Sequence, residues 1–135
     1  MLKVHSLGLA CLTISFATAV VSMGVTANTG YTQMKEINNY PFVATLVRAA
    51  KIRNRYQEIK AGMSPAEVLA FLDEPDEIRP LYEPRVKNGK IIGYTYWYVI
   101  QRLAKNGSVN EKQELLVRVS FSLNDRVSKV DAWGL

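Results

Sequence analysis

Apolar residues occupy every second position between Glu114 and Leu123, and mostly polar residues fill the positions between them. The first set is Leu115, Val117, Val119, Phe121 and Leu123, and the second is Leu116, Arg118, Ser120 and Ser122. Because successive side chains of a strand point to opposite faces, this pattern predicts a half-buried β-strand. Residues 91–105 are rich in aromatic and β-branched side chains, and a last strand is expected at 127–133. Asn106-Gly107 and Asn124-Asp125 are typical turn sequences, which predicts an antiparallel three-stranded meander.

Two helices are expected before these strands. Residues 41–61 have apolar residues three and four positions apart, with Asn39 as a candidate cap and Gly62 just past the end. The apolar faces of the two halves differ, which predicts a break near Ala50-Lys51 or two helices with different neighbours. The second half is the better candidate for core packing.

The second helix is expected at Pro65–Leu72, where Ser64 and Glu67 form a capping box and Pro65 fits the first turn. Residues 77–90 contain two prolines and Asn88-Gly89, so we expect a loop with at most a weak strand there. The predicted fold class is α+β, with two N-terminal helices packed on a three-stranded antiparallel meander sheet.

The first 27 residues have the features of a secretory signal peptide. Lys3 gives a positive start, Leu7–Val21 is largely apolar, and Val25-Thr26-Ala27 offers small residues for cleavage. An uncleaved membrane anchor is the alternative. We expect residues 28–40 to form a flexible tether and residues 41–135 to form a single domain in the periplasm.

The amino-acid composition limits the catalytic and metal-binding groups that the exported domain could use. The only cysteine, Cys11, and the only histidine, His5, lie in the predicted signal peptide and would be removed with it. The exported domain would then lack Cys/His metal sites, thiol nucleophiles and histidine bases. We therefore predict a protein that is not an enzyme, with no catalytic, cofactor-binding or metal-binding residues. The net charge of +5 favours anionic lipid or an acidic partner, and is no evidence for nucleic-acid binding.

The strand expected at 91–105 carries the first candidate contact site. Its aromatic side chains, Tyr94, Tyr96, Trp97 and Tyr98, point alternately to the two faces of the strand. One face must cover the helices, and the other could present an aromatic patch to another envelope protein. The alternative is a strand buried on both sides, for example by residues 31–50 folding back over it.

Charged clusters supply two more candidates. Arg48, Lys51 and Arg55 lie on one helical face and could contact anionic lipid or a cell-wall polymer. The alternative is an ordinary solvated helix face. Four carboxylates gather at Asp73-Glu74 and Asp76-Glu77, but they lack the spacing of a calcium loop, so we interpret them as a solvated turn.

Residues 55–132 resemble the SmpA/OmlA (BamE-like) family. The resemblance rests mainly on Ile59, Gly62-Met63-Ser64, Glu67-Val68, Leu72 and Pro75-Asp76, with weaker matches at Trp97-x-Val99, Val119-x-Phe121 and 124–127. It implies a fold like one repeat of the β-lactamase inhibitor protein, and a role in outer-membrane protein assembly or envelope integrity through another envelope protein. An inhibitor-like module that docks an enzyme cleft through loop 79–90 is the alternative.

Two positions depart from the family pattern. The family usually has glycine where this chain has Asp73, although aspartate tolerates a left-handed conformation better than most residues. The family's lipoprotein cysteine has no counterpart at the end of the apolar segment, since Cys11 lies inside it.

Overall fold

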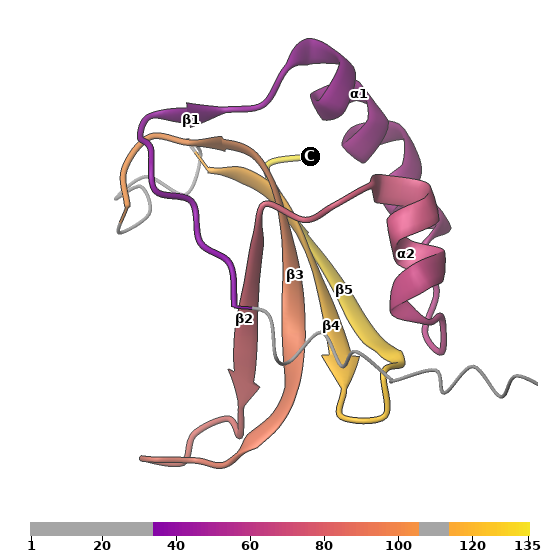
Figure 1. The fold of residues 1–135 in the computed structure, drawn as a ribbon, viewed down its shortest axis with the longest axis vertical. Coiled ribbons are helices and arrows are strands. Elements are labelled where there is room, and N and C mark those ends of the chain that lie inside the picture. The colour runs from indigo at the N-terminus through magenta and orange to yellow at the C-terminus, as the bar shows by residue number, and fades with distance from the viewer. Residues whose placement is uncertain (1–33, 106–113) are drawn as a thin grey trace, which may run out of the picture.

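The computed structural model describes residues 34–105 and 114–135. These ranges form an antiparallel sheet with two helices on one of its faces (Figure 1). The elements are β1 (Phe42–Val43), α1 (Leu46–Arg55), the 3-10 helix η2 (Tyr56–Glu58), α2 (Pro65–Leu72), β2 (Glu77–Tyr82), β3 (Ile91–Arg102), β4 (Leu115–Ser122) and β5 (Val127–Trp133). The predicted α+β class and the β3–β4–β5 meander are confirmed, and β1 and β2 extend the sheet to five strands. The turn predicted at Asn106-Gly107 lies outside the described residues.

The long strand β3 is the centre of the sheet. β4 pairs along one edge of it, whereas β2 and β1 share the other edge. β2 pairs with the first half of β3 through Glu77↔Trp97 and its neighbours, and β1 pairs with the end of β3 through Phe42↔Arg102. β2 is a six-residue strand, with a register shift between Leu81 and Tyr82, in the stretch where we expected a loop with at most a weak strand. Its Pro80 is tolerated because strand edges need no donor at every position.

The main core lies between the helices and the sheet. Alternate residues of β3 and β4 point into it, so the predicted two-residue period of β4 is confirmed. Ile52 and Ile59 from the first helical region and Val68 and Leu72 from α2 close the core from the other side. The second half of the first helical region does supply the buried side chains, as expected.

The start of the first helix differs from the prediction. α1 begins at Leu46, and its N-cap is Thr45, whose hydroxyl accepts from the Arg48 N–H at 3.3 Å. The predicted cap at Asn39 is therefore wrong. Of the two alternatives for this region, a break near Ala50-Lys51 is ruled out because α1 is continuous through these residues, and a second helical segment, η2, follows directly at Tyr56. Leu46 and Val47 are 89% and 80% exposed, so these two apolar residues belong to no core, whereas Phe42 packs against the second apolar cluster on the other face of the sheet.

Residues 35–43, which we call the N-terminal strap, fold back onto the sheet. Lys35 forms an antiparallel bridge with Ile78 on the outer edge of β2. Ile37 is buried and forms a second apolar cluster with Val99 and Leu116, on the face of the sheet away from the helices. Residues 35–40 are thus packed against the domain, where we expected a tether. The predicted signal peptide and the rest of the tether lie outside the described residues.

The α2 segment matches its prediction closely. The Ser64 hydroxyl accepts from the Glu67 N–H, and the Glu67 carboxylate accepts from the Ser64 N–H, which completes the capping box. The helix ends at Asp73, which has φ 62° and ψ −162°. This conformation is one that glycine adopts freely and other residues rarely adopt.

Candidate functional site

The sheet face away from the helices carries an ordered array of charged and aromatic side chains. Strand register lines them up in rows across the sheet. One row runs from Glu77 on β2 through Trp97 and Arg118 to Asp131 on β5. We call the array of Arg79, Trp97, Arg102, Arg118 and Trp133 the arginine–tryptophan face.

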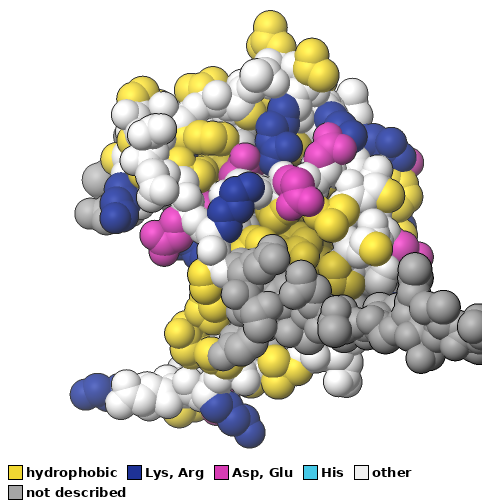
Figure 2. Space-filling model, in the orientation of Figure 1, with side chains coloured by type: hydrophobic (Ala, Val, Ile, Leu, Met, Phe, Trp, Pro, Cys, Tyr) yellow, Lys and Arg dark blue, Asp and Glu magenta, His cyan; other side chains and the backbone are white. Residues whose placement is uncertain are grey.

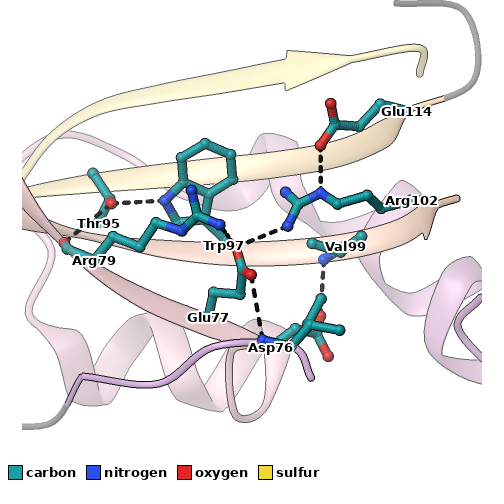
Figure 3. A network of polar contacts seen from close by, with 9 residues as sticks. Asp76, Glu77, Arg79, Thr95, Trp97, Val99, Arg102 and Glu114 are labelled. Atoms are coloured by element: carbon teal, nitrogen blue, oxygen red, sulfur yellow. Dashed lines mark hydrogen bonds and ion pairs between the residues drawn. The ribbon is translucent and has the colours of Figure 1, made fainter. Parts of the chain in front are cut away.

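Trp97 is the centre of this face. The guanidinium carbons of Arg79, Arg118 and Arg102 lie 4.8, 5.4 and 5.5 Å from the centre of its ring. The indole N–H donates to the Thr95 hydroxyl at 2.8 Å, which fixes the orientation of the ring (Figure 3). Each such cation–π contact contributes about 0.5–2 kcal/mol, depending on solvent exposure.

Arg118 extends the array to the edge of the sheet. Its guanidinium also lies 4.9 Å from the ring centre of Trp133, so it contacts both tryptophans. It forms an ion pair with Asp131 at 3.0 Å, and Lys129 approaches the same carboxylate at 2.8 Å. Burial alone would raise the pKa of Asp131, but hydrogen bonds from Lys129 and Arg118 outweigh it and lower the pKa.

A buried ion network supports the face from one side. Glu77 is 1% exposed, and its carboxylate contacts Arg79 at 2.8 Å and Arg102 at 3.0 Å. Arg102 is itself buried and also contacts Glu114 at 2.6 Å (Figure 3). Burial opposes the charged form of Glu77, yet its close contacts with the positive guanidinium groups of Arg102 and Arg79 prevail, so the pKa of Glu77 lies below its ordinary value. Burial likewise disfavours charged Arg102, and its two carboxylate partners reverse that effect and raise its pKa.

Three of the four predicted aromatic contact residues lie elsewhere. Tyr94, Tyr96 and Tyr98 point toward the helices and are 1%, 5% and 0% exposed. Tyr94 stacks on Phe121 with ring centres 4.9 Å apart, and the Tyr98 hydroxyl donates to the carbonyl of Asp73. These tyrosines are core residues in the folded domain and cannot contact a partner directly. Of the predicted set, only Trp97 lies on the arginine–tryptophan face, where it is partly exposed.

The face of β3 away from the helices agrees in part with each of the two alternatives derived from the sequence, an exposed aromatic patch and a strand buried on both sides. The N-terminal strap covers Val99 through Ile37, Tyr40 and Phe42, as the alternative of a strand buried on both sides required. Trp97 lies at the margin of this covered area. A pocket of about 290 Å³ lies between the strap and β2, beside this covered area. Its lining includes Tyr40, Arg79 and Tyr82.

The basic face of α1 meets the acidic turn that follows α2. Arg48 contacts Asp76 at 3.0 Å, and Lys51 contacts Asp73 at 2.6 Å. Arg55 pairs with Glu58 within its own helical region. Figure 2 shows these opposite charges side by side on one surface. The basic face and the acidic turn compensate each other's charge. Asp73 and Glu74 are exposed, as expected for a solvated turn, whereas Asp76 is only partly exposed. Contact of Arg48, Lys51 and Arg55 with anionic lipid stays a prediction.

Two carboxylates of the acidic turn also form contacts that stabilise the fold. The Asp76 carboxylate accepts from the Val99 N–H at 2.8 Å, which ties the turn to β3. Glu77 belongs to the buried network on the opposite face. Within residues 34–105 and 114–135, no group of three or more metal-ligating side chains is placed to hold a metal ion.

The hairpin between β2 and β3 projects from the sheet (Figures 1 and 2). Its turn uses left-handed conformations at Arg85 and Asn88, with φ of 63° and 59°. Tyr82 and Val86 are 55% and 52% exposed, and basic side chains lie toward the tip. This hairpin corresponds to residues 83–90 of the predicted docking loop 79–90, and residues 79–82 belong to strand β2.

Sequence reasoning missed most of the arginine–tryptophan face. Arg102 and Arg118 were not singled out as site residues, and Arg79 was included only as the first residue of the predicted docking loop 79–90. The alternation of side chains along β4 does place Arg118 on the polar face of its strand. The pairing of that face with Trp97 depends on strand register, which no local pattern specifies.

Comparison with known proteins adds little information about the family or function of this chain. No protein-family model matches the sequence, and no curated protein matches it. Among solved structures, the chain is similar to a crystal structure of a protein assigned as the osmotically inducible lipoprotein OsmE. The two share 23% sequence identity with a TM-score of 0.39, over 66% of this chain and 87% of the other. A likeness of this extent assigns neither a family nor a function.

Proposed function

We propose that this chain is a non-enzymatic protein of the cell envelope that binds another envelope protein through the arginine–tryptophan face. The observation that carries the proposal is Trp97 with three guanidinium groups around it on a sheet face that the helices leave open. Arginine and tryptophan are enriched in protein interfaces and supply much of their binding energy. The ion pairs fix the arginines in place, so binding would order few additional side chains.

The carboxylates support a binding role over acid–base chemistry. Glu77 and Asp131 pair with arginines, and the pKa of each lies below its ordinary value. A carboxylic acid that donates protons at neutral pH needs the opposite shift. Location in the periplasm rests on the predicted signal peptide, and association with the outer membrane rests only on the resemblance to the SmpA/OmlA family. Within the described part of the chain, neither helix is long and apolar enough to cross a membrane.

The biological process rests on a separate argument. The resemblance of residues 55–132 to the SmpA/OmlA family supports a role in outer-membrane protein assembly or envelope integrity. The confirmed α2 capping box and the β3–β4–β5 meander agree with the fold that this resemblance implies.

A crosslinking pull-down from envelope membranes tests the proposal. We expect Trp133→Ala to lower partner recovery several-fold, because Trp133 is 37% exposed at the rim of the face. Leu123→Ala is the matched control, since Leu123 is 55% exposed at the β4–β5 turn, away from the face. Thermal melts of both variants should match the parent within a few degrees. Equal recovery from the parent and both variants would refute binding through this face.

The projecting hairpin favours a second candidate, an inhibitor-like module that docks an enzyme cleft. Its exposed Tyr82 and Val86 and its basic tip are the features a cleft-binding loop would need. Replacing residues 84–89 by a two-residue Asn-Gly turn tests this candidate. Loss of partner recovery in this variant, with full recovery for Trp133→Ala, would favour the hairpin over the face.

A further inference from the structure

The pocket between the N-terminal strap and β2 borders the arginine–tryptophan face, because Arg79 belongs to both. Ile37 and Tyr40 line the pocket from the strap, and Pro80 and Tyr82 line it from β2. Its volume of about 290 Å³ lies just below the roughly 300–1,000 Å³ that is typical of sites for cofactors and drug-sized ligands. The pocket therefore has room for one side chain or for a fragment of that size.

The charges around the pocket balance one another. Arg79 and Lys105 are the cations that line it, and Glu36 and Glu77 are the anions. Glu77 is buried and contacts Arg79 at 2.8 Å, so these two groups neutralise each other, whereas Glu36 and Lys105 are exposed. A charged group would lose hydration on entering the pocket and would gain little net attraction in return. The balance of charge favours an uncharged side chain.

Arg79 distinguishes an aromatic side chain from an aliphatic one. Its guanidinium carbon lies 4.8 Å from the ring centre of Trp97, and the described part of the chain places no second ring against it. Arg118 in the same array contacts two rings, Trp97 at 5.4 Å and Trp133 at 4.9 Å. The strap bridges the outer edge of β2 and Trp97 lies on β3, so the pocket lies on the side of Arg79 away from Trp97. A ring in the pocket would give Arg79 the second aromatic neighbour that Arg118 already has.

We infer that the pocket holds one uncharged aromatic side chain of the envelope protein that binds the arginine–tryptophan face. The inference rests on the proposed function and adds the chemistry that the partner presents beside the face. The ring contacts Arg79 and the apolar walls at Ile37 and Pro80, and Tyr40 and Tyr82 supply further aromatic contacts. An aromatic side chain seated in a pocket is a common form of binding hot spot.

A titration with small molecules tests the chemistry of the pocket without the partner. The probes are p-cresol, which has the ring and hydroxyl of a tyrosine side chain, its saturated analogue 4-methylcyclohexanol, and N-acetylglucosamine. We expect p-cresol to shift the amide NMR signals of residues 36–40 and 77–82 with an affinity in the millimolar range, while the signals of α2 on the opposite face stay in place. The saturated analogue should bind about threefold or more weakly, because it lacks the ring that attracts Arg79. Arg79→Gln should remove this difference.

Filling the pocket tests its role in binding the partner. Glu36 is exposed and lines the pocket, so Glu36→Trp places an indole there. In the crosslinking pull-down, this variant should lower partner recovery several-fold, as expected for Trp133→Ala. Asn38→Trp is the matched control, since Asn38 is exposed on the same strap but does not line this pocket. Thermal melts of both variants should match that of the parent.

The outcomes separate the pocket from the face. Preference for p-cresol over its saturated analogue, with loss of recovery for Glu36→Trp and not for Asn38→Trp, would support the inference. Equal binding of these two probes, or none, would overturn it. Stronger binding of N-acetylglucosamine at the same signals would also overturn it, because it would assign the pocket to a glycan. Full recovery with Glu36→Trp but not with Trp133→Ala would end the role of the pocket and leave the proposed function standing, whereas full recovery with both would refute the two together.

Discussion

Replacing Asp73 by glycine should stabilise the protein, although it removes an ion pair. Asp73 ends α2 with φ 62° and ψ −162°, a region where residues other than glycine incur strain of about 1–3 kcal/mol. Two hydrogen bonds hold its main chain there. Its N–H donates to the Leu69 carbonyl at 2.8 Å, and its carbonyl accepts from the Tyr98 hydroxyl at 3.1 Å. Glycine would keep both bonds and release the strain.

Two losses oppose this gain. The Asp73 carboxylate contacts Lys51 at 2.6 Å, but it is 57% exposed, and a surface pair of this kind contributes about 0–1 kcal/mol. Glycine also gives the unfolded chain more freedom, which costs about 0.4–1 kcal/mol. The balance is a net stabilisation of about 1 kcal/mol. A domain of this size should then melt about 4–8 °C higher.

Urea unfolding followed by circular dichroism at pH 7 measures this balance. Lys51→Gln removes the ion pair alone and should cost at most about 1 kcal/mol. Asp73→Ala removes the same pair but keeps a Cβ, and should be clearly less stable than Asp73→Gly. If Asp73→Gly is no more stable than Lys51→Gln, the conformation at this helix end carries no strain and the reasoning fails.

Three further predictions concern the core and the caps. The pKa of Glu77 lies below its ordinary value of 4.5, so its stabilising effect is complete above about pH 4.5 and is lost as pH falls through the folded-state pKa; Glu77→Gln should flatten this part of the urea-midpoint curve between pH 2 and 7, and should cost about 1.5–3 kcal/mol at pH 7, because Arg102 loses one of its two carboxylate partners and keeps Glu114. Gly93→Ala should prevent normal pairing of β3 with β4, because the added Cβ would overlap the Phe121 carbonyl oxygen, and the expected result is loss of the cooperative melt or a drop of more than about 2 kcal/mol. Ser64→Ala should cost about 1 kcal/mol in urea unfolding through loss of the capping box, and an unchanged midpoint would contradict the assigned cap.

The elements that sequence predicts well are those specified by local chemistry. The α2 boundaries follow from a capping box and a proline, which act within a few residues. The β4 strand follows from a two-residue period that the core enforces. The first helix was mispredicted because Leu46 and Val47 are apolar yet exposed, so hydrophobicity alone did not identify the buried face. Strand β2 was predicted only weakly because Pro80 is unusual in strands, and only its pairing with β3 stabilises it there.

The candidate site was harder to predict for a different reason. The sequence of β3 is aromatic or apolar on both faces, so it does not tell which side the helices cover. The register between β3 and β4 shows which side the helices cover, since Tyr96 lies opposite Val119 in the core and Trp97 lies opposite Arg118 on the other face. The ion network around Glu77 joins residues of β2 and β3 to Glu114, which directly precedes β4, and these positions are far apart in sequence.

The location of the tryptophans has a practical consequence. The chain contains two of them, Trp97 and Trp133, and both lie on the same open side of the sheet beside Arg118. Tryptophan emission, excited selectively over tyrosine, therefore comes from this side of the molecule without any attached dye. A ligand that settles there should shift or quench the emission, whereas one that grips the distant hairpin should leave the spectrum as it was.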